Sequence, residues 1–223
     1  MSFKELIIDN YWYVRNLDKF LRGHNGFICG GCFKNIFNKE PVKDIDVFFK
    51  NETDWLDACR FFDAQCHNFE DIFEEFVDDD LVEPDTYYFK YENDKVKAYT
   101  HIKSGITVEL CRATFGNPEN VLNQFDFTIT KFAYYKELVK DDEGEHWEYK
   151  IICVDDFFEH LFTKRLVIDD QILFPASTFE RALRYTKYGY GMCRESKVKL
   201  LTAIRQLPEN ADLTNNSLYD GMD

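Results

Sequence analysis

The stretch GGCFKNIFNKEPVKDIDVFF, residues 30–49, decides the fold of this chain. Its two leading glycines lack a Cβ atom, so the backbone there can approach a phosphate group closely. Residues 32–38 predict one short helix, which Pro41 brings to an end. The stretch closes on DIDVFF at 44–49, a β-rich segment in which acidic and apolar residues alternate. Glycine turn, short helix and acidic strand together predict an anion-binding site beside a strand.

The two aspartates of that strand are the first candidate metal ligands. Asp44 and Asp46 stand at i and i+2, so on a strand their side chains point to the same face. Paired carboxylates suit hard cations such as Mg²⁺. Two such ions can activate a hydroxyl and neutralise a triphosphate during an in-line displacement. The free N–H groups of the helix after Gly30 and Gly31 would face the same phosphates.

These residues resemble the head motif of the polymerase-β-like nucleotidyltransferase superfamily. The likeness is greatest to the branch of CCA-adding tRNA nucleotidyltransferases and bacterial poly(A) polymerases. That branch has a double glycine, a helix bearing an Arg-Asp pair, and a proline shortly before Asp-x-Asp. Here the spacing matches without a gap, but Lys34 and Asn35 replace the Arg-Asp pair. The resemblance implies an enzyme that transfers a nucleoside monophosphate from an NTP to a hydroxyl, with Mg²⁺ or Mn²⁺ as cofactor.

The resemblance also implies a third carboxylate, contributed by a later strand between apolar residues. Glu109, in Val108-Glu109-Leu110, fits this description best. Asp126, in Phe125-Asp126-Phe127, is the second candidate. Asp44, Asp46 and Glu109 are therefore the expected catalytic and metal-binding residues. The nucleotide is expected to contact Gly30, Gly31, Lys34 and Lys43.

A second segment, RALRYTKYGY at 181–190, resembles the helix that follows the catalytic head in the same branch. There, that helix helps to bind the incoming nucleotide. Arg181 and Arg184 lie three residues apart, hence on one helical face, and are expected to contact the nucleotide. The alternative interpretation is that both arginines form ordinary surface salt bridges.

Charge limits the partners. The 223 residues carry 27 Lys and Arg against 41 Asp and Glu, a net charge of −14. Such a charge opposes contact along a nucleic-acid backbone. A small molecule or a protein is therefore favoured as acceptor over bulk nucleic acid. The expected local cationic cluster consists of Lys34, Lys43, Arg181, Arg184 and Lys187.

The compartment follows from what the sequence lacks and from its cysteines. It has neither an apolar run long enough to cross a membrane nor the pattern of a signal peptide, so a cytoplasmic protein is expected. Seven cysteines, an odd number, favour reduced thiols.

Two alternatives to the enzyme stay open. One is a catalytically inactive nucleotidyltransferase fold that binds a nucleotide or a protein partner. The lesser one is a dithiol oxidoreductase using Cys29 and Cys32, which requires depressed thiol pKa values.

The whole chain predicts an α+β architecture, with a mixed β-sheet head, flanking helices and a helical C-terminal third. Expected helices cover 3–22, 53–64 with Thr53 as N-cap, a segment from Asn68, 155–165, a segment from a capping box at Ser177 to Gly189, and 195–206. Expected strands cover 25–31, 44–49, 86–92, 96–102 and 106–111, with a hairpin of 126–136 and 146–153. The expected divisions are a head with its N-terminal helix (1–153), a helical region packed on it (154–208) and a polar tail (209–223).

Overall fold

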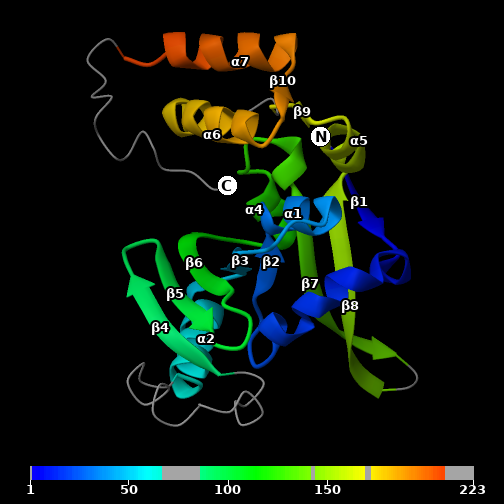
Figure 1. The fold of residues 1–223 in the computed structure, drawn as a ribbon. Helices are drawn as coiled ribbons and strands as arrows, with labels where there is room; N and C mark the ends of the chain where they lie inside the picture. Colours follow the sequence, from blue (N-terminus) through cyan, green and yellow to red (C-terminus); the bar gives the residue numbers. More distant parts are fainter. Residues whose placement is uncertain (1, 67–85, 142–143, 169–171, 209–223) are drawn as a thin grey trace.

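The structure is a computed structural model that describes residues 2–66, 86–141, 144–168 and 172–208. An eight-stranded sheet in the order β1-β8-β7-β2-β3-β6-β5-β4 forms its centre (Figure 1). The strands are β1 (Phe3–Leu6), β2 (Phe27–Cys29), β3 (Asp44–Phe49), β4 (Tyr87–Glu92), β5 (Val96–His101), β6 (Thr107–Phe115), β7 (Phe132–Asp141) and β8 (Gly144–Val154). Only β3 and β6 pair in parallel, and the other neighbours are antiparallel. The sheet is therefore mixed, as the sequence predicts.

One face of the sheet is covered by three helices: η1 (Ile8–Leu21), α1 (Cys32–Asn38) and α2 (Glu52–Ala64). Their apolar side chains join those of the strands in one core cluster. Ile45, Val47 and Phe49 of β3 point into this core and are 0% exposed. Because alternate strand residues face opposite sides, Asp44 and Asp46 are directed to the other face. Burial of the apolar half of β3 thus fixes where its acids point.

The other face of the sheet has less cover. The short helix α4 (Pro118–Leu122) packs over Phe27 and Phe48, with Phe125 edge-on to Phe48. Beyond that small cluster, a cavity separates the sheet from the helix α6 (Pro175–Lys187). This partly open face is where the acids of β3 lie.

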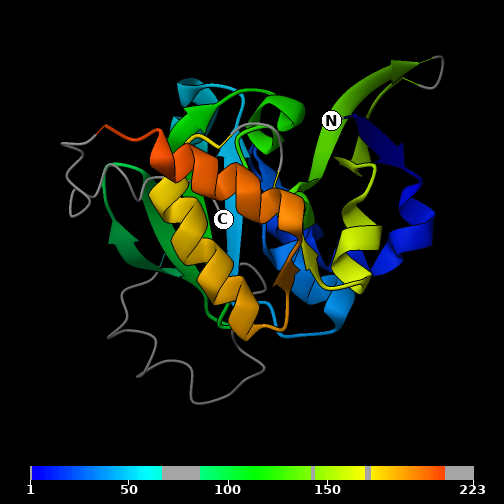
Figure 2. The same ribbon diagram turned by 90° about the horizontal axis from the view of Figure 1, so that it is seen from above.

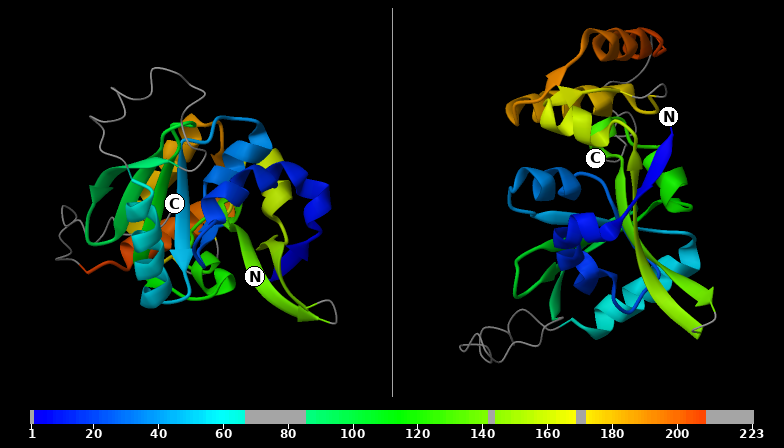
Figure 3. Two further views of the ribbon diagram at one scale, coloured as in Figure 1. Left: turned by 90° about the horizontal axis from the view of Figure 1, so that it is seen from below. Right: turned by 90° about the vertical axis from the view of Figure 1, so that its right-hand side faces the viewer.

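The C-terminal region stacks its helices at one end of the molecule, with α7 (Arg194–Arg205) against α6 (Figures 1 and 2). A two-stranded parallel sheet of β9 (Arg165–Leu166) and β10 (Gly191–Met192) joins this region to α5 (Phe157–Phe162). The region is anchored to the rest through Asn38, whose Nδ2 donates to Tyr190 Oη at 3.0 Å, and through the ring contact of Phe127 with Tyr185. Figure 3 shows it capping one end of the sheet.

Several expected elements differ from the structure. Residues 3–6 form β1, because they pair with β8, and a 3₁₀ helix with a kink at Tyr11 follows. Asn51, not Thr53, caps α2: its side chain accepts a hydrogen bond from Asp54 N at 2.9 Å. The expected capping box is wrong as well, since α6 begins at Pro175 and Ser177 lies buried inside it.

The remaining elements follow the predicted order, including the strand 44–49, the helix 32–38 and the three strands β4, β5 and β6. The helix expected from Asn68 lies outside the described residues, as does the expected tail at 209–223. Strands β9 and β10 were not anticipated. None of the helices in the described part of the chain combines the length and apolar character needed to cross a bilayer.

Candidate functional site

Three carboxylates share the open face of the sheet. Asp46 of β3 stands directly opposite Glu109 of β6 in the parallel ladder. Opposed residues on neighbouring strands project to the same side, and Asp44 joins them by strand alternation. Asp44 is exposed, whereas Asp46 and Glu109 are half-buried. We call these three residues the acidic floor.

Two residues of the edge strand β4 reach over this floor. Tyr91 donates a hydrogen bond from its hydroxyl to Glu109 Oε1 at 2.6 Å. Lys90 donates from Nζ to Thr107 Oγ1 at 2.7 Å, and Thr107 stands opposite Asp44. Both point inward because the register of β4 shifts between Phe89 and Tyr91. Sequence reasoning missed this pair, and no signal in the sequence marks the irregularity.

The acids are close enough to act on Tyr91 together. Burial raises the pKa of Tyr91, the hydrogen bond to Glu109 raises that pKa further, and the negative charges of Glu109, Asp44 and Asp46 add to the effect. The phenol is therefore held in its protonated, hydrogen-bond-donating form. Its hydroxyl and the three carboxylates belong to one electrostatic neighbourhood.

The acidic floor has the oxygen ligands that a magnesium site needs, but its three carboxylates are not close enough together to form such a site. Within the described residues, no three His, Cys, Asp or Glu side chains lie close enough together to hold a metal ion. The reason at Glu109 is visible, because its carboxylate is engaged by Tyr91. Carboxylate oxygens on one face are nevertheless the ligands that Mg²⁺ prefers. The residues therefore fit the cofactor, provided that Glu109 turns toward Asp46.

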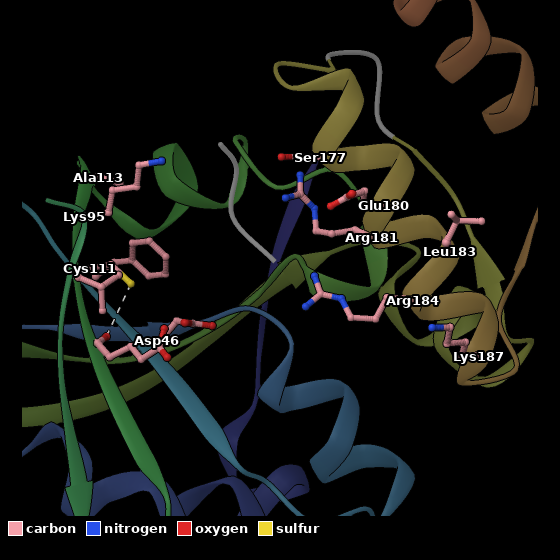
Figure 4. Close-up of a pocket in the computed structure, with 13 residues that line it drawn as sticks. Asp46, Lys95, Cys111, Ala113, Ser177, Glu180, Arg181, Leu183, Arg184 and Lys187 are labelled. Carbon is pink, nitrogen blue, oxygen red and sulfur yellow. Dashed lines mark hydrogen bonds between the residues drawn. The ribbon is translucent and has the colours of Figure 1, made fainter. Parts of the chain in front are cut away.

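Helix α6 forms the opposite wall of a cavity of about 670 Å³ above the floor. Figure 4 shows Arg181, Arg184 and Lys187 on α6 across the cavity from Asp46. We call the α6 residues that line the cavity the α6 wall: Ser177, Glu180, Arg181, Leu183, Arg184 and Lys187. Ser177 Oγ is buried there, with no hydrogen-bond partner in the described part of the chain. An acidic floor thus faces a wall rich in cations.

Arg181 is the buried member of that wall. Its Nε donates to Asp126 Oδ2 at 2.8 Å, and its Nη2 donates to the same oxygen. The side chains of Arg181 and Asp126 are only 6% and 4% exposed. A buried ion pair of this kind ties α6 to the segment before β7. The structure therefore puts Asp126 with Arg181, and Glu109 beside Asp46.

A second cavity, of about 410 Å³, adjoins the first. Asp46 and Arg184 line both cavities. The second cavity also contains three of the predicted nucleotide contacts, Gly31, Lys34 and Lys43. Asp44 and the aromatic residues Tyr185 and Tyr188 line it as well. The two cavities therefore form one bipartite hollow, and they meet at Asp46 and Arg184.

The glycine turn and Lys34 border this second cavity. Gly30 has a φ of +96°, a conformation that favours glycine and lets β2 turn directly into α1. Lys34 is 5% exposed, and its Nζ donates to Glu40 Oε2 at 3.2 Å and to Asn35 Oδ1. The same ammonium lies 5.0 Å from the centre of the Tyr188 ring. Lys34 thus lines the hollow while it is held by internal partners.

The Cys29 and Cys32 thiols do not have the chemistry of a redox pair. Both are buried, and burial raises each pKa well above its ordinary value. The charge of Asp46 raises both values further. A dithiol oxidoreductase requires the opposite shift. The raised pKa values therefore speak against the lesser alternative of a dithiol oxidoreductase, because the pair lies in the core under an acidic site.

Comparison with known proteins bears on this geometry. A family described as "Gad2: Gabija anti-defense 2 family protein" matches residues 3–164. A protein named Gabija anti-defense 2, from Bacillus phage SPbetaL7, is 23% identical over 203 residues. That match covers 91% of this chain and 42% of the relative, so the chain spans less than half the length of the relative.

Solved structures give the fold. A CCA-adding enzyme in complex with CTP matches with a TM-score of 0.55 at 15% identity, over 92% of this chain and 46% of that chain. An apo form of a CCA-adding enzyme matches with a TM-score of 0.53 at 14% identity, over 92% and 47% of the two chains. At such low identity the likeness shows the fold alone, which is that of the nucleotidyltransferase head.

Proposed function

The chain belongs to the Gabija anti-defense 2 family. From its fold and its acidic floor, we propose that it is a metal-dependent nucleotidyltransferase. The reaction is transfer of a nucleoside monophosphate from an NTP to a hydroxyl. The single observation that carries the proposal is the register of Asp46 opposite Glu109, with Asp44 on the same face. This arrangement puts three hard oxygen ligands where a bipartite hollow can receive a nucleotide.

The floor residues take the following roles in this proposal. Asp44, Asp46 and Glu109 hold Mg²⁺ or Mn²⁺, which supplies charge neutralisation for the triphosphate and activation of the attacking hydroxyl. Glu109 would join the set with its carboxylate while its Oε1 still accepts the hydrogen bond from Tyr91. The half-buried positions of Asp46 and Glu109 strengthen the electrostatic effect of these two carboxylates relative to bulk water.

The nucleotide is bound across the two cavities. The triphosphate lies in the second cavity, along Gly31 and Lys43, next to the turn at Gly30. Lys34 lines the same cavity and adds its positive charge, although its ammonium is hydrogen-bonded to Glu40 and Asn35. Arg184 lines both cavities and is therefore placed to contact the nucleotide where they meet. Arg181 acts differently, since it positions α6 through Asp126. The turn favours glycine at position 30 because its φ is positive, and the missing Cβ leaves the backbone open to a phosphate.

The acceptor is a protein or small-molecule hydroxyl in this proposal. The name of the phage relative describes action against a defence system called Gabija, and we extend that role to this chain. A net charge of −14 opposes tight holding of long nucleic acid. Covalent modification of a protein hydroxyl in a target is consistent with both observations.

The experiment is transfer from each α-³²P-labelled NTP, with Mg²⁺ or Mn²⁺, to a bacterial extract as acceptor pool. We expect label in a discrete protein or small-molecule product, and none with an Asp44→Ala/Asp46→Ala double variant. A Glu145→Ala/Glu148→Ala variant removes the same charge from the exposed part of β8 and should keep transfer. Full activity in the Asp44/Asp46 double variant would end this proposal.

A second candidate is a catalytically inactive fold that binds a nucleotide or a protein. Three observations favour it: Glu109 is engaged by Tyr91, Lys34 by Glu40, and Arg181 by Asp126. In this case, isothermal titration would detect metal-dependent nucleotide binding while no extract, RNA or small-molecule pool accepts label. Transfer with any acceptor decides for the enzyme.

A further inference from the structure

One row of residues runs across four strands at the site. Tyr91 of β4 opposes Ala98 of β5, Ala98 opposes Glu109 of β6, and Glu109 opposes Asp46 of β3. All members of such a row project to the same face of the sheet. Tyr91 therefore lies in line with the acids, two strands away from Glu109.

Ala98 is what allows Tyr91 to reach the acids. Strands lie about 4.8 Å apart, so the backbones of Tyr91 and Glu109 are separated by roughly 10 Å. Ala98 is 0% exposed and carries only a methyl group between them. The Tyr91 ring crosses this gap, and its hydroxyl arrives 2.6 Å from Glu109 Oε1.

That position is the one an acceptor hydroxyl needs. A hydroxyl nucleophile must lie within about 2.6–3.2 Å of the group that takes its proton. The Tyr91 hydroxyl meets this distance at the carboxylate beside Asp46, and the side chain is 37% exposed. We propose that Tyr91 is itself an acceptor, so that the protein transfers a nucleoside monophosphate to its own Tyr91 in cis. The inference rests on the proposed nucleotidyltransferase function.

The transfer balances without a further reactant. The phenolic oxygen of Tyr91 forms a bond to the α-phosphorus of the NTP. The bond from that phosphorus to the oxygen bridging the β-phosphate breaks, and pyrophosphate leaves with the electron pair. The phenolic proton passes to Glu109 and then to solvent. The product is a phosphodiester between Tyr91 and the nucleoside.

The modification would also change the site. Once esterified, Tyr91 no longer has the proton that it donates to Glu109 Oε1. Glu109 then loses its internal partner and is released toward Asp46, on the opposite strand. Self-modification thus removes the hydrogen bond that engages Glu109 before the reaction.

The test uses the purified full chain alone, incubated with each NTP and Mg²⁺ or Mn²⁺. Intact mass spectrometry should show one added nucleotidyl group, and peptide sequencing should locate it at Tyr91. A Tyr91→Phe variant should lose this label, whereas Tyr149→Phe, at a half-buried position on β8, should keep it. The rate constant should not depend on protein concentration, and an Asp44→Ala/Asp46→Ala chain mixed with wild type should stay unlabelled.

Other outcomes overturn the inference in distinguishable ways. Transfer to an extract acceptor with no label at Tyr91 refutes self-modification and leaves the nucleotidyltransferase intact. Absence of transfer to any acceptor refutes both. An acid-labile label on Lys90, whose ammonium is bonded to Thr107, would identify a phosphoramidate. That result would show that Lys90, and not Tyr91, is the acceptor. Labelling of the Asp44/Asp46 variant by wild type would refute the cis reaction.

Discussion

The two sides of the cavity are built in different ways. The acidic floor is held by backbone pairing of β3 with β6, and its acids are exposed or half-buried. The α6 wall is held in place by a buried ion pair between Arg181 and Asp126, whose side chains are 6% and 4% exposed. The carboxylates of the floor are therefore accessible to a ligand, whereas Arg181, the most buried charge of the wall, stabilises the position of α6.

This contrast shows that the type of residue does not settle its role. Glu109 and Asp126 both lie between apolar neighbours in the sequence, and both fit the description of a third carboxylate. Their surroundings separate them, because Glu109 faces Asp46 while Asp126 faces Arg181. Removing Glu109 should therefore affect activity, and removing Asp126 should affect stability.

The largest effect is expected at Glu109. Glu109→Gln keeps the size of the side chain and removes the charge that holds metal and accepts a proton. Transfer should fall by about 10²–10⁴-fold, the usual contribution of an acid–base group, while the urea unfolding midpoint stays near that of wild type. Initial rates with a labelled NTP and equilibrium unfolding by circular dichroism measure the two quantities. A variant with wild-type rates would move the third carboxylate away from Glu109.

The next effect concerns the wall. Arg181→Ala removes the guanidinium that pairs with the buried Asp126 carboxylate, which costs about 3–5 kcal/mol of the free energy of unfolding. Urea denaturation gives this number directly. Replacing both residues together, as Arg181→Met with Asp126→Leu, should restore most of the stability, since no unpaired charge is left. An Arg181→Ala protein as stable as wild type would show that the pair contributes little to holding α6.

The same contrast explains what the sequence could predict. The floor rests on local alternation in residues 44–49, which apolar burial on one side enforces, so the shared face of Asp44 and Asp46 could be predicted from the sequence. Their role as metal ligands stays a prediction. The α+β class followed from the order of such elements. Pairing between segments that are distant in the sequence cannot be predicted from the local pattern of apolar and polar residues. The Arg181–Asp126 pair joins residues 55 apart, and residues 3–6 form β1 because they pair with the distant strand β8.

Tyr91 shows the same limit at a single position. Its approach to Glu109 depends on a register shift in β4 and on the small Ala98 in the next strand. Neither condition can be predicted from the residues that neighbour Tyr91 in the sequence. The predicted capping box at Ser177 failed for a related reason, because Pro175 starts the helix earlier and Ser177 turns into the cavity wall.

A smaller effect is expected where wall and floor act on the same ligand. Arg184 lines both cavities, whereas Lys187 lines only the larger one. Arg184→Ala should weaken nucleotide binding by about tenfold, which corresponds to one charge-assisted hydrogen bond of about 1.4 kcal/mol. Lys187→Ala should weaken it by less than Arg184→Ala. Titration with a non-hydrolysable NTP analogue measures the affinity of both variants. Equal losses of affinity would contradict the inference that Arg184 contacts the nucleotide more closely than Lys187.

The smallest effect is expected with bulk nucleic acid, although the fold is that of CCA-adding enzymes. Arg181 is bound to Asp126, and Lys34 to Glu40, so the wall and turn offer few cations to a phosphate backbone. The net charge of −14 repels the phosphates of an RNA chain that extends beyond this site. Fluorescence anisotropy with bulk tRNA or duplex RNA at physiological salt should therefore show no submicromolar binding. Arg184→Ala should change that weak signal by less than about twofold, because one cation contributes little to a salt-screened contact. Submicromolar affinity that declines steeply with salt, and that Arg184→Ala weakens strongly, would instead show that the α6 wall is a nucleic-acid surface.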